Sequence, residues 1–596
     1  MKNFTTRPEL SGTFGAISAT HWLGAAVGSS VLERGGNAFD AAVACGFVLQ
    51  IVEPHLNGPG GDVVMIVKAA GEDAPVVICG QGVAPQAATM QAFDALNLKM
   101  IPGTGLLPAV VPGAFDAWML LLRDYGTWTV EDVLAYAISY AEKGFPLLSR
   151  AVASIVPVAD LFREEWPSSA EIWLPGNALP RPREIMFTPA IANTYKRIIH
   201  EAKSRSADRI EQIEAARAAF YSGFVAEAID SFYRKAELFD TTGRRNGGLL
   251  RGSDMANWRA TKEKSVSLEF RGLRVHKAGP WSQGPVFLQQ LSLLQQFDLE
   301  RLVAVGGDQF IHMVVECAKL AFADREAFYG DPAATDIPIE TLLSDEYARE
   351  RAKLVGPNAS LEWNASYLQN AAERLGVIAG LAGSEVPAGP GGGEVTFAAV
   401  PEIEGDTVHL DIADRFGNVI SATPSGGWLQ SSPAVPGLGF SLSTRGQMFW
   451  LDERLPSCLR PGTRPRTTLT PTLVTREAEG MLAFGTPGGD QQDQWPLTVF
   501  LRHVLGGQGL QEAIDGPMFH SKHWPSSFYP RDYELGRILI EDRFGTDVAA
   551  RLSERGHKVS VDGSWSLGRI CAVERRAGLL FAGATPRHMQ SYAIVR

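Results

Sequence analysis

The sequence is poor in the features that mark several large classes of protein. Only five cysteines occur in 596 residues, and no two of them form a C-x-x-C pair: Cys45, Cys79, Cys317, Cys458 and Cys571. An odd number of scattered cysteines predicts neither a disulfide framework nor a zinc site. We therefore expect a fold that is held together by its apolar core.

Long hydrophobic runs and an excess of basic residues are also absent. The sequence contains no uncharged run of 18 apolar residues, so we expect no membrane span. The net charge of −11 disfavours a nucleic-acid partner, because binding to phosphates needs a basic surface. The first ten residues contain no apolar signal core, which predicts a protein without a secretory leader and a cytoplasmic location.

The remaining composition, with 45% hydrophobic residues, is typical of a globular protein that forms one large packed unit or several domains. Apolar spacing predicts helices within 16–52, 114–145, 190–235 and 306–330. Gly35-Gly36 interrupts the first of these ranges, and Asn37 or Asp40 is expected to cap the helix that follows. Residues 55–62 form a glycine loop before a predicted buried strand at 63–68. Residues 380–393 resemble a surface linker.

After this linker the pattern changes to a period of two. Thr407, His409 and Asp411 alternate with apolar residues, which predicts a half-buried strand that opens on a hydroxyl. Residues 415–418 form a predicted turn, and 419–423 form a second strand. His409 is expected to support or pack against its neighbours.

A threonine hydroxyl becomes a useful nucleophile only beside a base. If the peptide bond between Asp406 and Thr407 is cut, Thr407 gains a free α-amine with a pKa near ~8, which can take the hydroxyl proton. The glycines of 485–489 could then present backbone N–H groups to the resulting oxyanion. Taken alone, a threonine that opens a strand is far more often structural, and a Gly-Gly loop is usually a turn. A phosphate-binding loop is disfavoured because neither glycine-rich nucleotide motif is present.

Several segments in the same order resemble the gamma-glutamyltransferase family, from about residue 14 to the C-terminus. Residues 34–42 are similar to the family's RKGGNAVDAAVA, 52–61 to VEPHSSGIGGG, 407–418 to TTHxSVVDxxGN, 464–472 to RPLSSMSPT and 485–489 to GSPGG. Residues 111–113, 321–325 and 330–332 match further family segments.

This resemblance implies an α/β fold, the four-layer αββα sandwich of N-terminal-nucleophile (Ntn) hydrolases. It further implies a proenzyme that is cut between Asp406 and Thr407 into a large subunit, 1–406, and a small catalytic subunit, 407–596. Thr407 would carry the acyl group, Gly488 and Gly489 would bind the oxyanion, and Ser425 would support the nucleophile. A turn residue is the alternative for Ser425.

The substrate positions implied by the family are altered. Gln81 stands where the family has an arginine for the substrate's α-carboxylate, and Trp450 replaces an aspartate for its α-amino group. Gln447 is kept, and Thr467 and Thr468 replace a pair of serines. The segment between Trp450 and Arg464 is short, which predicts a reduced lid. One nearby arginine could instead bind a carboxylate, although solvated side chains are the default for each: Arg445, Arg454, Arg460, Arg464 and Arg466.

Three functions remain open from the sequence. The first is a hydrolase of a small amide that is not glutathione, as in the related oxamate amidohydrolases. The second is a gamma-glutamyl hydrolase or transferase that acts on glutathione or related compounds, and the third is an unprocessed, non-catalytic scaffold. The expected partners are a small-molecule amide and the two subunits of the same chain, and a homo-oligomer is compatible with the sequence. No metal site is expected, because two histidines without further ligands, His520 and His523, are usually structural. No cofactor is expected either.

Overall fold

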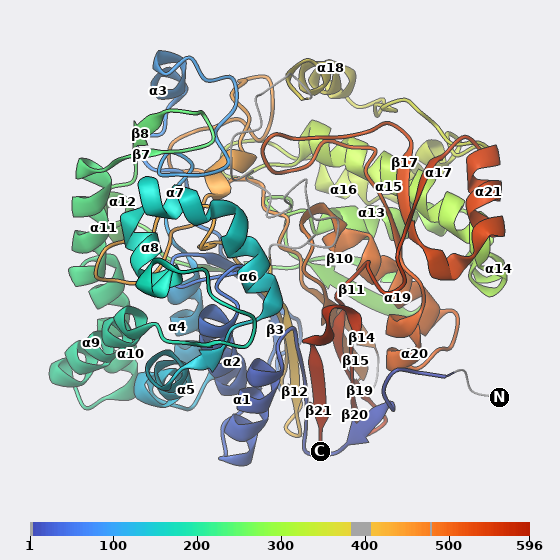
Figure 1. Cartoon of the computed structure of the whole chain (residues 1–596). Helices are drawn as coiled ribbons and strands as arrows, with labels where there is room; N and C mark the ends of the chain where they lie inside the picture. Colours follow the sequence, from blue (N-terminus) through green and yellow to red (C-terminus); the bar gives the residue numbers. More distant parts are fainter. Residues whose placement is uncertain (1–3, 383–406, 477–479) are drawn as a thin grey trace.

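The computed structural model describes residues 4–382, 407–476 and 480–596. Within these residues two large antiparallel sheets lie face to face, and helices cover the outer side of each. In Figure 1 the blue-to-green helices of the first half of the chain lie on one side of the strands, and the yellow-green and orange helices lie on the other. This is the four-layer αββα sandwich that the resemblance implies.

The first sheet, here the Thr407 sheet, interleaves strands from both sides of Thr407. Its order is β21, β2, β12, β13, β3, β4, β9. The central hairpin of β12 (Leu410–Asp414) and β13 (Val419–Ser425) lies between β2 (Gly15–Ala19) and β3 (Asp62–Lys68). The outer strands are β21 (Tyr592–Val595), β4 (Val76–Gly80) and β9 (Thr261–Lys264). Residues before and after Thr407 therefore share one hydrogen-bonded framework.

The second sheet, here the opposing sheet, is also built from distant parts of the chain. Its strands, in spatial order, are β1 (Leu10–Gly12), β20 (Leu579–Ala584), β19 (Cys571–Arg576), β15 (Gly480–Gly485), β14 (Thr472–Arg476), β11 (Leu273–Lys277) and β10 (Val266–Phe270). Small and branched apolar side chains fill the layer between the two sheets, among them Ala16, Val64, Ala483 and Val573.

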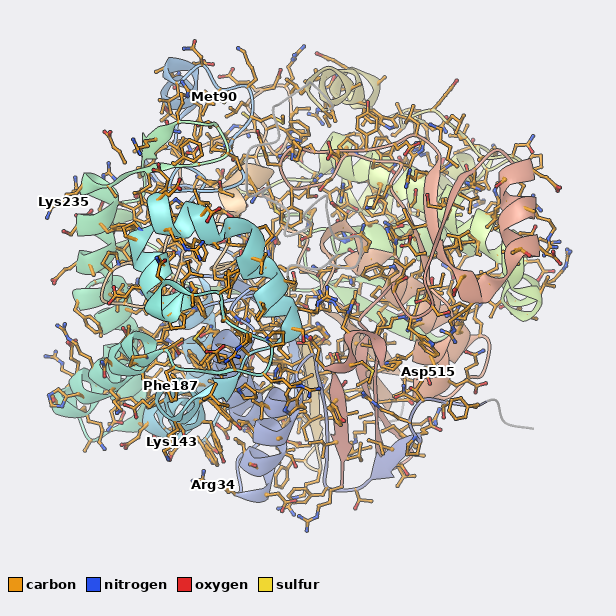
Figure 2. The ribbon with its side chains drawn as sticks, viewed as in Figure 1. Arg34, Met90, Lys143, Phe187, Lys235 and Asp515 are labelled. Atoms are coloured by element: carbon orange, nitrogen blue, oxygen red, sulfur yellow. The ribbon has the colours of Figure 1, made fainter. Side chains whose placement is uncertain are left out.

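The helices bury the outer face of each sheet in a separate core. The Thr407 sheet is covered by α1 (Trp22–Glu33), α2 (Ala38–Val52), α4 (Ala114–Tyr125), α5 (Val130–Lys143), α9 (Pro189–Arg205), α10 (Arg209–Tyr221) and α11 (Phe224–Lys235). The opposing sheet is covered by α13 (Pro285–Leu294), α15 (Gly307–Phe328), α19 (Trp495–Val504) and α20 (Leu510–Asp515). Figure 2 shows charged side chains such as Arg34, Lys143 and Lys235 at the outer rim.

The helix predictions are confirmed, with one correction. Asn37 caps α2 in a capping box with Asp40, as the Gly-Gly-Asn pattern indicates. The beginning of the 16–52 range is wrong, because Gly15–Ala19 form β2. This strand lies between the helices and the opposing sheet and is buried on both faces, so its sequence lacks the alternation that marks a half-buried strand.

The strand after Thr407 also differs from the prediction of a half-buried strand. Both faces of β12 are buried, since its polar face points into the layer between the sheets instead of into solvent. The predicted linker at 380–393 lies outside the described residues, except for 380–382 at the end of α18 (Ala371–Leu381). No helix in the described ranges combines the length and apolar character that a membrane crossing needs.

Candidate active site

Thr407 stands at the mouth of the central hairpin, three residues before the regular part of β12. It forms an antiparallel bridge with Ser425, and the Val408 N–H donates to the Pro424 carbonyl at 3.0 Å. The hydroxyl oxygens of Thr407 and Ser425 are 3.1 Å apart, and both side chains are buried. The structure thus brings the two predicted hydroxyl residues into contact. Asp406, the other half of the predicted cleavage site, lies outside the described residues.

Two further polar pairs follow this contact along the hairpin. His409 lies opposite Thr423, with Nδ1 2.9 Å from the threonine hydroxyl. Asp411 lies opposite Ser421, which donates to its carboxylate at 2.6 Å, and His409 Nε2 is 3.0 Å from the same carboxylate. We call these three cross-strand pairs the polar ladder: Thr407–Ser425, His409–Thr423 and Asp411–Ser421.

The ladder has a defined direction of hydrogen bonding. A carboxylate only accepts, so Nε2–H of His409 donates to Asp411, and Nδ1 accepts from the Thr423 hydroxyl. Burial raises the pKa of Asp411, while His409 and Ser421 oppose that shift by stabilising the carboxylate. The satisfied network rigidifies the hairpin end that carries Thr407.

The predicted oxyanion loop follows β15 of the opposing sheet. Gly485, where that strand ends, packs against His409 so closely that a Cβ there would lie 2.3 Å from the ring. The loop therefore begins beside the ladder, on the face that also carries the Thr407 hydroxyl. Gly488 and Gly489 have φ values of 123° and 54°, and a Cβ at Gly488 would lie 2.4 Å from the Trp495 ring. The φ value and the short Cβ contact at Gly488 require glycine.

Gln81 extends the row of residues that begins with Thr407 and Ser425. Ser425 pairs with Asp62 on β3, and Val63 pairs with Gly80, the residue before Gln81. Gln81 is buried, and its side-chain amide donates to the neighbouring Gly82 carbonyl at 3.1 Å. Its Oε1 has no hydrogen-bond partner among the described residues. A buried amide oxygen without a partner is consistent with a group that contacts substrate.

At the second altered position, an unexpected cation lies against the side chain of Trp450. Trp450 is buried, and the guanidinium of Arg531 lies 3.8 Å from the centroid of its ring. Arg531 donates to the carbonyls of Gln447 and Phe449 at 2.8 and 3.0 Å, and burial lowers its pKa to about 9. Gln447 accepts from the Tyr529 N–H at 3.0 Å, so it fastens this loop.

The two threonines of the predicted hydroxyl pair have different environments. Thr467 Oγ1 accepts from the Leu469 N–H at 3.3 Å, and the Thr467 backbone bonds to Trp281 and Gln283. Thr468 Oγ1 is buried and has no hydrogen-bond partner in the part of the chain that the structure describes. Thr468 is therefore the member of the pair whose hydroxyl is available to a ligand.

Four of the five candidate arginines form ion pairs within the protein. Arg464 bonds to Glu263 and Asp331, and Arg466 bonds to Glu326. Arg454 pairs with Asp452 at the surface, with 57% of its side chain exposed. Arg445 differs: its side chain is fully buried, and it reaches Asp62 in the row that contains Ser425.

The comparisons with known proteins decide the family. The gamma-glutamyltranspeptidase family model matches residues 24–595. The chain belongs to the gamma-glutamyltranspeptidase family. It is thereby an amidohydrolase of the self-processing, N-terminal-nucleophile type.

Three proteins that resemble this chain illustrate the variety within the family. The glutathione hydrolase-like YwrD proenzyme of Bacillus subtilis is 29% identical, over 97% of each chain. The oxamate amidohydrolase proenzyme of Klebsiella pneumoniae is 27% identical, over 96% of this chain and 97% of the relative. Solved structures of a protein named LmbA2991 are 48% identical over the full length of both chains, with a TM-score of 0.91.

The sequence analysis did not assign the contacts of several residues in this candidate site. Asp411, Ser421 and Thr423 were detectable, because polar residues alternate along both strands of the hairpin. The contacts of Arg445 and Arg531 were not, because each joins segments that only the fold brings together.

The pair of His312 and His557 and the single His523 lie outside the site, and hydrogen bonds hold them in place. His312 and His557 bond to each other at 2.9 Å beside Glu316, and Lys319 donates to that carboxylate at 2.5 Å. An ammonium in this position competes with a metal cation. His523 accepts from the Gly536 N–H at 3.0 Å, which gives it a structural contact in its loop.

A buried acid behind the ladder predicts a pH-dependent stability. Burial raises the pKa of Glu53 from its usual 4.5 to about 7, although it accepts from Thr20 at 2.9 Å. The folded protein then holds this proton more tightly than the unfolded chain, so stability falls as pH rises from about 4.5 to about 7. The loss is at most about 3 kcal/mol.

We expect Glu53→Gln to remove this loss. Compared with the wild type, its melting temperature should gain on the order of 2 °C more at pH 8 than at pH 5. Thermal unfolding at the two pH values measures the difference. An equal gain at both would show that Glu53 is already ionised in the folded protein at pH 5.

Proposed function

We propose that this protein cuts itself between Asp406 and Thr407 and then hydrolyses amides of small acids that lack an α-amino group. In this proposal 1–406 form the large subunit and 407–596 the small one. Thr407 is the nucleophile, Ser425 supports it, and Gly488 and Gly489 bind the oxyanion.

The proposed chemistry uses the Thr407 hydroxyl twice. In maturation it attacks the Asp406 carbonyl carbon, the peptide C–N bond breaks, and water hydrolyses the ester, leaving a free α-amine on Thr407. With substrate, the hydroxyl attacks the amide carbon and its proton passes to that amine and then to the leaving nitrogen. Water hydrolyses the threonyl ester and regenerates the enzyme. The 3.1 Å contact between Thr407 and Ser425 supports this role for the pair.

The observation that carries the substrate preference is the Arg531 guanidinium on the Trp450 ring. The family resemblance implies an anionic aspartate at position 450 for the substrate ammonium. Here an uncharged indole stacks with a cation at 3.8 Å, so the local charge is reversed. An ammonium brought to this place is repelled, and it loses a charge-assisted hydrogen bond worth about 1.5–3 kcal/mol. The name of the Klebsiella relative, an oxamate amidohydrolase, agrees with a substrate that has no such ammonium.

A matched pair of substrates tests the preference. Gamma-glutamyl p-nitroanilide and glutaryl p-nitroanilide differ only in the α-amino group. We expect kcat/KM of the matured enzyme to be at least about tenfold higher for the glutaryl compound. A higher value for the glutamyl compound would favour the glutathione-type reaction and contradict the proposal.

A further inference from the structure

The mouth of the Thr407 sheet aligns three polar side chains on neighbouring strands. Thr407 lies opposite Ser425, and Ser425 lies opposite Asp62. Directly opposite residues project from the same face of a sheet, and neighbouring strands are about 4.8 Å apart. Asp62 therefore faces the same space as the Thr407 hydroxyl, about 10 Å from it across two strand spacings. This distance is within the reach of one small substrate.

Arg445 extends from a short 3-10 turn, Arg445–Met448, to this row. Its Nε lies 2.9 Å from Asp62 Oδ2, and both side chains are completely buried. The guanidinium also lies 5.1 Å from the Trp428 ring centroid and 5.6 Å from that of Phe528. Aromatic rings and one carboxylate oxygen thus fix its orientation.

The two terminal nitrogens of Arg445 remain unused. Both Nη1 and Nη2 are buried, and neither has a hydrogen-bond partner among the residues that the structure describes. Buried donors in folded proteins nearly always have partners, so two on one guanidinium require an explanation. A purely structural arginine is satisfied by its surroundings, as Arg464 is by Glu263 and Asp331.

A carboxylate is the ligand that matches these donors. Its two oxygens accept two parallel N–H bonds from a guanidinium, which is the strongest common pairing for that group. Asp62 holds the Nε edge and leaves the terminal nitrogens for a second anion. Asp62 also stands where the family segment VEPHSSGIGGG has its last glycine, so the feature that anchors Arg445 is a departure from that pattern.

We propose that Arg445, anchored by Asp62, binds a carboxylate on the acyl part of the substrate. The substrate class is then the monoamides of dicarboxylic acids, with the amide carbon at Thr407 and the free carboxylate at Arg445. This inference rests on the proposed function, because it assigns the far end of the same acyl group. In this proposal Arg445 supplies, from a different part of the fold, the carboxylate contact for which the family has an arginine at the position of Gln81.

The test compares acidic and neutral substrates of equal length on matured enzyme. The acidic series comprises p-nitroanilides of oxalic, malonic, succinic and glutaric acids, and in the neutral series each free carboxylate is replaced by a carboxamide. We expect the wild type to prefer the acid of at least one chain length by tenfold or more. Arg445→Lys, which keeps the charge but not the paired donors, should lower kcat/KM for that acid roughly ten- to a hundredfold, and by clearly more than for the neutral amide of the same length.

Removing Arg445 alone takes the cation away from the buried Asp62 carboxylate, which can prevent folding. The double variant Asp62→Asn with Arg445→Gln keeps the pair neutral and should lose the preference for acids. Arg454→Gln is the matched control, because this arginine lies in the same region but pairs with Asp452 at the surface. It should keep the wild-type preference.

A binding measurement separates this inference from the proposed function. The free dicarboxylate of the preferred length should raise the melting temperature of matured wild type and have no effect on Arg445→Lys. Turnover of neutral amides without a preference for acids, or a preference that survives in Arg445→Lys, would overturn the carboxylate site and leave the proposed function standing. A cleaved enzyme that hydrolyses no anilide, while a dicarboxylate still stabilises it through Arg445, would overturn the proposed function alone.

Discussion

Thr407→Ala is expected to remain a single chain and to show no turnover of any amide. The proposal gives one hydroxyl both tasks, and alanine removes it while leaving the backbone bridge to Ser425 possible. A denaturing gel and an anilide assay on the purified variant measure the two losses together. Because the change deletes only a hydroxyl and a methyl group, the fold should survive, which circular dichroism verifies.

Thr407→Ser is the matched control for this experiment. Serine keeps the nucleophile and its contact with Ser425, so it should still mature and still turn over substrate, although more slowly because the methyl group that restricts the rotamer is gone. Cleavage or turnover in Thr407→Ala would assign the chemistry to another residue.

Gly488→Ala is expected to lower turnover by roughly ten- to a thousandfold, the range for loss of one oxyanion donor. Gly488 has a φ of 123°, and its new Cβ would lie 2.4 Å from the Trp495 ring, so the loop must move. In the proposed mechanism, the displaced Gly488 amide can then no longer donate to the oxyanion. The effect should fall on kcat, because the oxyanion exists only after attack.

Gly437→Ala controls for backbone strain alone. Gly437 also has a positive φ, 78°, but a Cβ there meets no heavy atom within 4 Å. It should retain turnover within about threefold of the wild type, because mild strain in an exposed loop does not move the active site. Equal activity in Gly488→Ala and the wild type would remove this glycine from the mechanism.

Features that depend on local pattern could be predicted from the sequence. The Gly-Gly-Asn stop placed the start of α2, because capping is a contact between residues close in the chain. Alternation after residue 407 predicted the hairpin that brings Thr407 to Ser425. The same reasoning failed for β2 and for the buried faces of β12, because burial on both sides is decided by layers that form from distant segments.

The contacts around Trp450 and Arg445 could not be predicted for the same physical reason. The sequence indicates that Trp450 replaces a charged group, but it does not place Arg531 over the ring, because that contact spans 81 residues and a loop. The pair of Arg445 and Asp62 spans 383 residues. The charge at a site is the sum of such contacts. The replacement of an aspartate by Trp450 therefore predicts only a lost interaction, and it does not predict the positive charge that Arg531 brings to this position.

The identity of the new N-terminus in an active preparation tests the central claim most directly. Intact-mass analysis of freshly purified, active wild-type protein should give two polypeptides, residues 1–406 and residues 407–596, with Thr407 first in the smaller one. An active preparation that consists of one uncut chain, or whose smaller piece begins at another residue, would contradict the account.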